Sequence, residues 1–250
     1  MPHFIREKPH ISDGPFMSPS WTSVDAWIKN CINLHPLCSA SDVAFLPKRV
    51  IDIGHSADDG HNFSVKLQVC EPGQIGYYTT LSYCWGEHRP LMTTSKTLPE
   101  FMNEIPWSSL PKTFQDAILV TKRLGFKYIW IDSLCIVQDN EEDWEEQAAR
   151  MGMIYELSFL TLVAAYGEDS HAGMLEKRPT FCGTISIAND DSEATQDIYV
   201  RDHLSDNKHD WLGGNVQTLP EDTITENYPW AQRGWCFQER LLSPRVLYFT

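Results

Sequence analysis

Apolar residues are spaced along this chain in two ways, one typical of helices and the other typical of strands. Residues 111–124 carry apolar side chains at three- and four-residue intervals, which predicts an amphipathic helix. The runs 127–132 and 159–165 are short and apolar, and the continuity of the second predicts a strand buried on both faces. Strands that alternate with helices are typical of an α/β fold, with a mainly parallel sheet and helices on both faces. An α+β fold, in which the strands do not form one sheet, is the alternative.

The N-terminal part of the chain is predicted to add a helix and a hairpin to this core. Residues 1–20 contain prolines but no apolar period, which predicts an extended arm before a domain at 21–250. Ser23 is the predicted N-cap of a helix, and residues 49–53 and 63–69 have the pattern of strands. We expect these two strands to pair and to cover one edge of the sheet.

Residues 77–86 and 127–132 are predicted to be parallel strands, because a single helix connects them. Parallel strands end at the same edge of a sheet, and open α/β sheets bind their ligands beyond that carboxyl edge. Trp85 and Asp132 should therefore lie close together there. The aromatic residues earlier in the first strand are better explained as core.

Residues 141–155 are predicted to form a helix that packs on the sheet. Acidic side chains in its first turn complement the helix dipole. Its stripe at helical spacing, which we expect to be core, consists of Trp144, Ala148, Met151 and Tyr155.

Residues 167–228 differ in character from the segments on either side. They are rich in acidic residues and asparagine, with short strand patterns at 181–188 and 197–201. We interpret them as an insertion, a small β subdomain that partly covers the ligand pocket, in a core formed by residues 77–166 and 229–250. The last strand pattern reaches the final residue of the sequence, which suggests a domain of a longer protein.

The charge of the chain restricts the partners that it can have. Its 34 acidic and 20 basic residues give a formal net charge of -14, which repels nucleic acids and anionic membranes. No apolar run approaches the roughly 18 residues of a membrane-spanning helix, and the N-terminus lacks a signal peptide. We therefore expect a cytoplasmic protein, with neither nucleic acid nor membrane as its partner.

The cysteines are predicted to be reduced. There are seven, an odd number, mostly inside apolar stretches, which favours buried thiols over a disulfide framework. Cys31, His35 and Cys38 have a spacing that suits zinc, but no fourth ligand is visible in the sequence. The favoured interpretation of this group is two buried thiols and a capping histidine, so no metal site is predicted.

The richest stretch for chemistry is WAQRGWCFQERLLS at 230–243. Trp235 and Glu239 are four residues apart, so on a helix they lie on one face, one turn apart. An aromatic ring beside a carboxylate, with Arg233 and Arg240 nearby, suits a charged ligand that contains a ring. The alternatives are that Glu239 forms a structural ion pair with one of these arginines and that Trp235 belongs to the core.

Four segments in a fixed order carry a family resemblance. They read LSYCWG at 81–86, LPKTFQDA at 110–117, YIWIDSLCIVQD at 128–139 and RGWCFQE at 233–239. Together they resemble the fungal heterokaryon-incompatibility (HET) domain, over about residues 20–250. This resemblance implies an effector of cell death or non-self recognition, often the N-terminal module of a longer protein with regulatory or sensor domains.

A more distant resemblance implies an enzymatic activity. HET domains look like relatives of Toll/interleukin-receptor (TIR) domains, which have a flavodoxin-like sheet. Residues 81–87 resemble the first TIR strand and its loop, and residues 235–239 resemble the TIR segment in which a Trp-Cys pair precedes the catalytic glutamate. Enzymatic TIR domains split NAD at the nicotinamide-ribose bond, which implies that Glu239 is catalytic.

The same resemblance implies a binding site for an NAD-like nucleotide. Trp235 would stack on a ring of the ligand, and an arginine would bind the pyrophosphate. For Asp132, fixing the edge loop is favoured over binding a ribose hydroxyl. The predicted binding residues are Ser82, Tyr83, Trp85, Gly86, Arg89, Asp132, Arg233 and Trp235.

Two functions from different classes follow. The first is an NAD hydrolase without a prosthetic group, with NAD as substrate, that is activated by self-association into a homo-oligomer. The second is a non-enzymatic signalling module that triggers cell death through protein contacts. The register of Trp235 and Glu239 favours the first, and the lack of an evident general acid beside Glu239 favours the second.

Overall fold

The computed structural model describes residues 18–35, 38, 44–54, 64–87, 89–175, 182–188, 195–201 and 229–249. In chain order its elements are α1 (Ser18–Leu34), β1 (Arg49–Asp52), β2 (Lys66–Val69), β3 (Tyr78–Ser82), α2 (Leu98–Asn103), η1 (Trp107–Ser109), α3 (Lys112–Arg123), β4 (Tyr128–Trp130), α4 (Asp132–Cys135), α5 (Glu141–Glu156), β5 (Leu160–Ala164), β6 (Cys182–Ala188), β7 (Thr195–Arg201), η3 (Pro229–Gln232), α7 (Gly234–Leu242) and β8 (Val246–Phe249).

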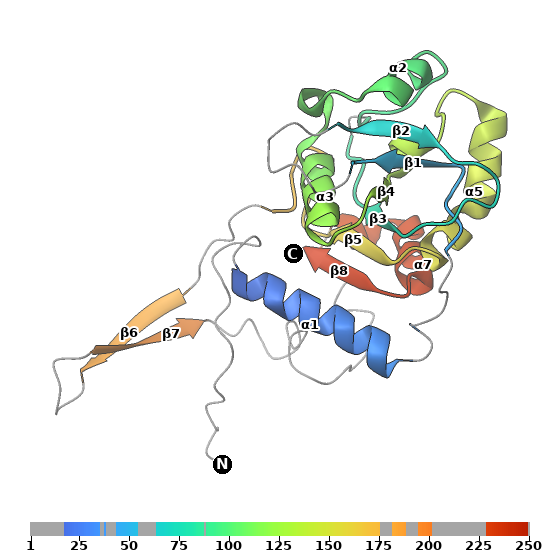
Figure 1. The fold of residues 1–250 in the computed structure, drawn as a ribbon. Coiled ribbons are helices and arrows are strands. Elements are labelled where there is room, and N and C mark those ends of the chain that lie inside the picture. Colours follow the sequence, from blue (N-terminus) through green and yellow to red (C-terminus); the bar gives the residue numbers. More distant parts are fainter. Residues whose placement is uncertain are drawn as a thin grey trace.

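A six-stranded mixed sheet forms the centre of the molecule, in the order β2-β1-β4-β3-β5-β8 (Figure 1). Strand β3 is parallel to β4 and β5, and β8 is parallel to β5. Strand β1 is antiparallel to both β2 and β4. The predicted α/β fold and the predicted hairpin at the sheet edge are therefore confirmed, and the α+β alternative is wrong. If the four parallel strands are numbered by their order in the chain, they lie across the sheet in the order 2-1-3-4, which is the flavodoxin-like order.

Two neighbouring strands inside the sheet, β3 and β5, are fully buried. Every residue of β3 and β5 is buried, as expected when helices cover both faces of parallel strands. Their threonines have partners: Thr79 bonds Thr121 at 2.7 Å between hydroxyl oxygens, and Thr80 bonds Thr161 at 2.6 Å. These pairs remove the cost of burying unpaired hydroxyl groups.

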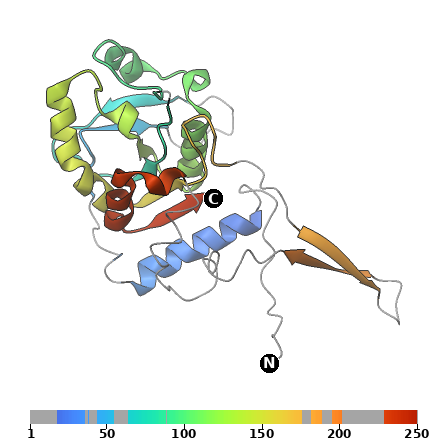
Figure 2. The ribbon, with the colours of Figure 1, turned by 180° about the vertical axis from the view of Figure 1, so that it is seen from behind.

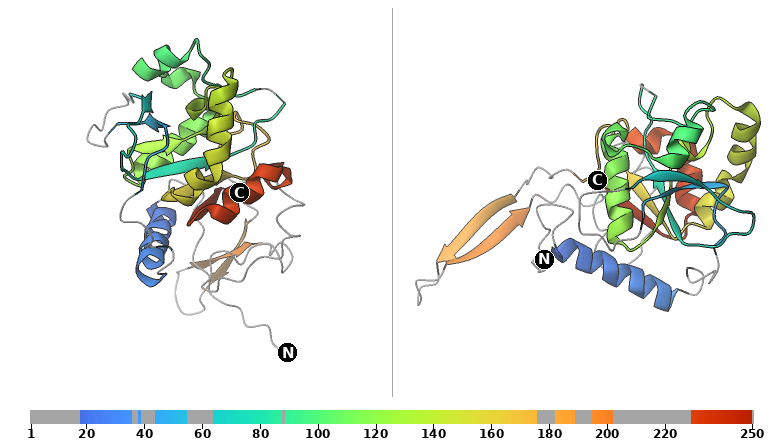
Figure 3. Two further views of the ribbon diagram at one scale, coloured as in Figure 1. Left: turned by 90° about the vertical axis from the view of Figure 1, so that its right-hand side faces the viewer. Right: turned by 45° about the horizontal axis from the view of Figure 1, so that its top comes forward.

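Helices cover the two faces of the sheet, with α3 on one face and α5 and α7 on the other (Figure 1). The connections explain this division, because right-handed crossovers that run in opposite directions along a sheet put their helices on opposite faces. Helices α5 and α7 contact each other, and Figure 3 shows them side by side. None of the helices in the described ranges is long and apolar enough to cross a membrane.

Helix α1 packs against the end of α3. Trp21 of α1 is buried in the main core, and the guanidinium of Arg123 lies 5.4 Å from the centroid of its ring. Arg123 also pairs with Asp25 at 3.8 Å. The predicted start at Ser23 is wrong, because the helix already includes Ser18 and the following proline. Residues 1–17 of the predicted arm lie outside the described residues.

The inserted segment contains an antiparallel hairpin. Strands β6 and β7 pair along their whole length, and Figure 2 shows them apart from the six-stranded sheet. The two strands that were predicted in the insertion thus form one ribbon. The remaining parts of the insertion, at 176–181, 189–194 and 202–228, lie outside the described residues.

Candidate functional site

A cleft of about 220 Å³ opens beyond the carboxyl ends of β3 and β4, between helices α5 and α7. Its lining residues are Trp85, Asp132, Ile136, Gln138, Trp144, Ala148, Met151, Arg233, Trp235 and Glu239. Half of these were predicted from the sequence to be site residues, namely Trp85, Asp132, Arg233, Trp235 and Glu239. None of the described residues of the insertion lines the cleft.

Glu239 is the most deeply buried acidic group of the cleft, with 5% of its surface exposed. The hydroxyl of Ser82, at the end of β3, donates a hydrogen bond to its carboxylate. Trp230 in turn donates from Nε1 to the Ser82 Oγ at 2.5 Å. This chain of hydrogen bonds leaves one carboxylate oxygen of Glu239 outside the bond to Ser82.

The environment of Glu239 favours its protonated form. Burial raises the pKa of Glu239 to about 7, and the negative charge of Asp132 adds to this rise. The hydrogen bond from Ser82 and the positive charge of Arg233 oppose it. Near neutral pH the two forms of Glu239 are thus similarly populated, which is the range in which a carboxyl group serves best as an acid or a base.

Asp132, just after β4, also lines the cleft and is fixed by two donors. The indole Nε1 of Trp85 donates to Oδ2 of Asp132 at 2.8 Å, and the backbone N–H of Ser133 donates to Oδ1 at 2.6 Å. Burial raises the pKa of Asp132, although both of these bonds oppose the rise. Asp132 therefore holds the loops after β3 and β4 together, as the loop-fixing interpretation expected.

Arg233 supplies the positive charge of the cleft. Its guanidinium donates to the backbone carbonyl of Tyr83, which leaves other N–H groups of the fork for a ligand. Within the part of the chain that the structure describes, neither Arg233 nor Arg240 forms an ion pair with Glu239. The structural ion pair that competed with a catalytic role is therefore absent there.

Two of the three tryptophans that line the cleft are well exposed. Trp235 of α7 is 53% exposed and Trp144 of α5 is 49% exposed. Trp235 is therefore not a core residue. The prediction that Trp144 belongs to the core is wrong, whereas Tyr155 of the same stripe is buried. The apolar stripe of α5 has two parts, since its first turns line the cleft and its last turn packs on the sheet.

Four predicted binding residues do not line the cleft. Ser82 is buried and bonds Glu239. Tyr83 is buried, and its hydroxyl donates to Ser133 Oγ at 3.1 Å. Gly86 has a φ of 77°, and a Cβ there would lie 2.4 Å from the Cβ of Asp169 in the loop after β5. Arg89 is exposed and does not line the cleft. Their direct contact with a ligand remains a prediction.

The comparison with protein families shows which family the chain belongs to. Residues 78–239, more than half of the chain, match the family described as Heterokaryon incompatibility protein (HET). The chain belongs to this HET family. The match begins at β3 and ends at Glu239, so all lining residues of the cleft lie inside the HET region. A search of curated proteins and a search of solved structures found no match. The HET match supports a role related to heterokaryon incompatibility.

The thiols near the cleft of this HET chain are not activated. Burial raises the pKa of Cys84, and it raises those of Cys135 and Cys236 to about 12. A nucleophilic cysteine needs a lowered pKa. The prediction of buried, reduced thiols is confirmed for these three positions.

Sequence reasoning missed several residues of the HET cleft. Gln138 and Ile136 come from the irregular segment after α4, and Met151 and Ala148 come from α5. The family segment at 128–139 contained the first two, which was the available signal. Trp230, which donates to Ser82, lies within the stretch 230–243, but nothing in its spacing predicted a bond to β3.

Proposed function

We propose that this HET domain hydrolyses an NAD-like nucleotide at the nicotinamide-ribose bond and acts in this way as a cytoplasmic cell-death effector. One observation supports the proposal above all. A buried glutamate with a pKa of about 7 lines a cleft together with two exposed indole rings, those of Trp144 and Trp235. A carboxylate beside aromatic walls suits a ligand that carries a flat cationic ring next to a sugar.

The size of the cleft limits how much of the ligand enters it. Pockets that enclose a drug-sized ligand measure about 300–1,000 Å³, whereas this cleft measures about 220 Å³. We infer that the nicotinamide and its ribose occupy the cleft, while the pyrophosphate lies at its mouth near Arg233. A guanidinium suits that place because it matches two phosphate oxygens at once.

The reaction requires a base and a stabilising charge, both of which Glu239 would supply. The bond between ribose C1′ and the nicotinamide nitrogen breaks, and its electron pair leaves with the ring. Because this ring is cationic before the reaction, it leaves as neutral nicotinamide and needs no proton from a general acid. The lack of an acid partner for Glu239 is therefore compatible with this chemistry.

The sugar develops oxocarbenium charge as the bond breaks, and an ionised carboxylate near it lowers the barrier. A water molecule then attacks C1′ and loses a proton to Glu239, which gives ADP-ribose and nicotinamide. Asp132, held by Trp85, would orient a ribose hydroxyl. Trp144 and Trp235 would hold the ring and keep bulk water out.

The proposal is tested by incubating NAD with the purified chain, both free and clustered through an oligomerising fusion, and measuring nicotinamide release. We expect clustered wild-type protein to release nicotinamide, and Glu239→Ala to lower the rate at least about a hundredfold. Glu104→Ala, which removes an exposed carboxylate at the end of α2, is the matched control and should keep full activity. Undiminished release by Glu239→Ala would refute the site.

A second candidate function is a signalling module that acts by self-association without catalysis. Phe237 and Leu241 favour it, because these neighbours on one face of α7 are 55% and 66% exposed. Such a pair beside the cleft suits contact with another protein surface. Clustered wild-type protein that releases no nicotinamide under any condition would favour this function over hydrolysis.

A further inference from the structure

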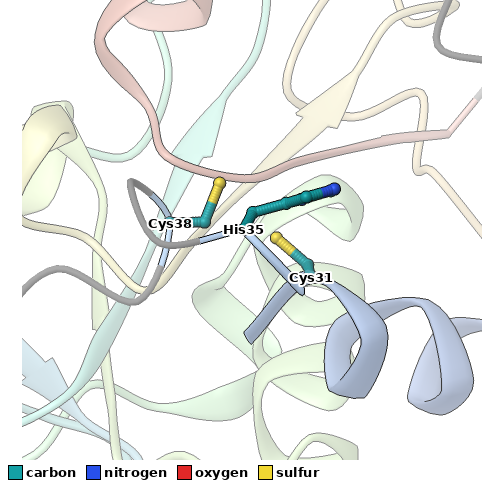
Figure 4. A group of neighbouring side chains, drawn as sticks. All are labelled: Cys31, His35 and Cys38. Carbon is teal, nitrogen blue, oxygen red and sulfur yellow. The ribbon is translucent and has the colours of Figure 1, made fainter. Parts of the chain in front are cut away.

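Three potential metal ligands meet where α1 ends. Cys31 lies in the last turn of the helix, His35 directly follows it, and Cys38 comes three residues later. One ligand atom from each residue lies within 4.8 Å of the other two, and Figure 4 shows the three side chains in one group. They lie outside the HET match at 78–239 and do not line the cleft.

The backbone brings these side chains together. The N–H of His35 donates to the carbonyl of Cys31 at 3.1 Å, and the N–H of Cys38 donates to the carbonyl of His35 at 2.9 Å. These two bonds hold His35 and Cys38 close to the end of the helix. Cys31 is buried, Cys38 is half-buried and His35 is exposed. A metal ion at this place would be shielded on the thiol side and open to water on the histidine side.

The geometry is close to that of a zinc site. Zinc binds thiolate sulfur at about 2.3 Å and imidazole nitrogen at about 2.0 Å, so a tetrahedral site puts two sulfurs about 3.8 Å apart. Since the ligand atoms already lie within 4.8 Å of one another, they need to approach by only about 1 Å. Two thiolates and an imidazole are also the ligand types that zinc prefers over harder cations.

We propose that Cys31, His35 and Cys38 bind one Zn²⁺ ion, with a water molecule as the fourth ligand. The lack of a fourth protein ligand argued against zinc in the sequence, but a water ligand on the exposed side completes four-coordination. Both thiols lose their protons on binding, so the two thiolates balance the charge of the ion.

The metal site would secure helix α1 to the connection between α7 and β8. The buried guanidinium of Arg245 donates to the carbonyl of Cys38 and to that of Phe159, the latter at 3.0 Å. The Cys38 thiol lies 3.8 Å from the carbonyl oxygen of Pro244. Figure 4 shows the chain of this connection passing beside Cys38. The ion would therefore hold Cys38 in the position in which its carbonyl accepts the hydrogen bond from Arg245.

The test measures metal bound to the full 250-residue chain, purified under reducing conditions. We expect about one zinc per chain, and Co²⁺ in its place should give the sulfur-to-metal charge-transfer band and the visible bands of a tetrahedral thiolate site. Cys31→Ser and Cys38→Ser should each lose the bound zinc. Cys70→Ala, at another buried cysteine, and His171→Ala, at an exposed histidine, should keep it.

Two further measurements separate metal binding from a folding defect. His35→Cys should retain zinc and strengthen the charge-transfer band, because it replaces the imidazole by a third thiolate. Removal of zinc by a chelator should lower the melting temperature of the wild type and leave that of Cys38→Ser unchanged. A wild-type chain that binds no zinc or Co²⁺, or Cys31→Ser and Cys38→Ser variants that bind as much zinc as the wild type, would overturn the proposal.

Discussion

Glu239 combines two properties that usually exclude each other, deep burial and access to a cleft. Its carboxyl group is 5% exposed, yet it lines the cleft beside Trp235. A buried carboxylate without a direct cationic partner costs free energy when it ionises. Such a cost is tolerated where the charge serves a reaction, which is why strongly shifted carboxyl groups are concentrated at functional sites.

The pH dependence of stability should reveal this cost. The pKa of Glu239 is about 7 in the folded protein and about 4.3 in an unfolded chain. Between these values the folded state binds more protons, so the free energy of unfolding falls by about 4 kcal/mol in total as the pH rises through both of them. Glu239→Gln should remove this fall, because the amide has no proton to lose and stays neutral as the pH rises.

Urea unfolding at pH 5 and pH 8 measures the effect as a difference between the wild type and the variant. Between pH 5 and pH 8 the free energy of unfolding of the wild type should fall by about 3 kcal/mol more than that of Glu239→Gln. The free energy of unfolding of Glu104→Gln, at an exposed position, should change with pH as it does in the wild type. Parallel pH dependences of Glu239→Gln and the wild type would show that the carboxyl group is not shifted in the folded protein.

The loops that follow β3 and β5 approach each other closely at one glycine. Gly86 has a φ of 77°, and any Cβ at this position would overlap Asp169, 2.4 Å away. Trp85 directly precedes it and donates to Asp132. The close approach of the two loops thus holds one wall of the cleft in place.

Gly86→Ala should destabilise the protein more than a matched glycine substitution. Gly125 has a similar φ of 82°, but no atom lies within 4 Å of its Cβ position. Gly125→Ala should therefore cost only the backbone strain of about 1–2 kcal/mol, and Gly86→Ala should cost about 1–3 kcal/mol more for the overlap. Chemical denaturation of both variants measures this difference. Equal losses would mean that the loop after β5 moves away at no cost.

Local signals in the sequence predicted most elements correctly. Helix α3 was predicted from its apolar period, a signal that lies within the element itself. The start of α1 was missed because Pro19 was taken as part of an extended arm, whereas proline is well tolerated in the first turn of a helix. Trp144 was misplaced because a helical period identifies an apolar face without telling whether that face meets the core or a cleft.

The site as a whole was only partly predictable. Right-handed connection of parallel strands was enough to put Trp85 and Asp132 at one edge. The bond between Ser82 and Glu239 joins positions 157 residues apart, and nothing in the sequence gives the rotation of α7 that allows it. The same holds for the group at Cys31, His35 and Cys38, where the turn after α1 decides the distances between the ligands.

The whole molecule carries a charge that opposes self-association. With a formal net charge of -14, copies of this chain repel each other at low salt. The exposed Phe237 and Leu241 provide an apolar contact that does not weaken when charges are screened. Salt should therefore separate these two effects, because it reduces the repulsion and leaves the apolar attraction.

We expect self-association to strengthen as salt rises from about 0.01 M to 0.15 M, where the screening length falls from about 30 Å to about 8 Å. Sedimentation velocity over this range measures it directly. Replacing both Phe237 and Leu241 by serine should abolish the association, because it removes the exposed apolar pair from α7. Met102→Ser is the control, since Met102 is 45% exposed on α2 and away from this face. Association that weakens as salt rises would show that the contact is electrostatic. Association that survives the double substitution unchanged would place the contact on a surface other than α7.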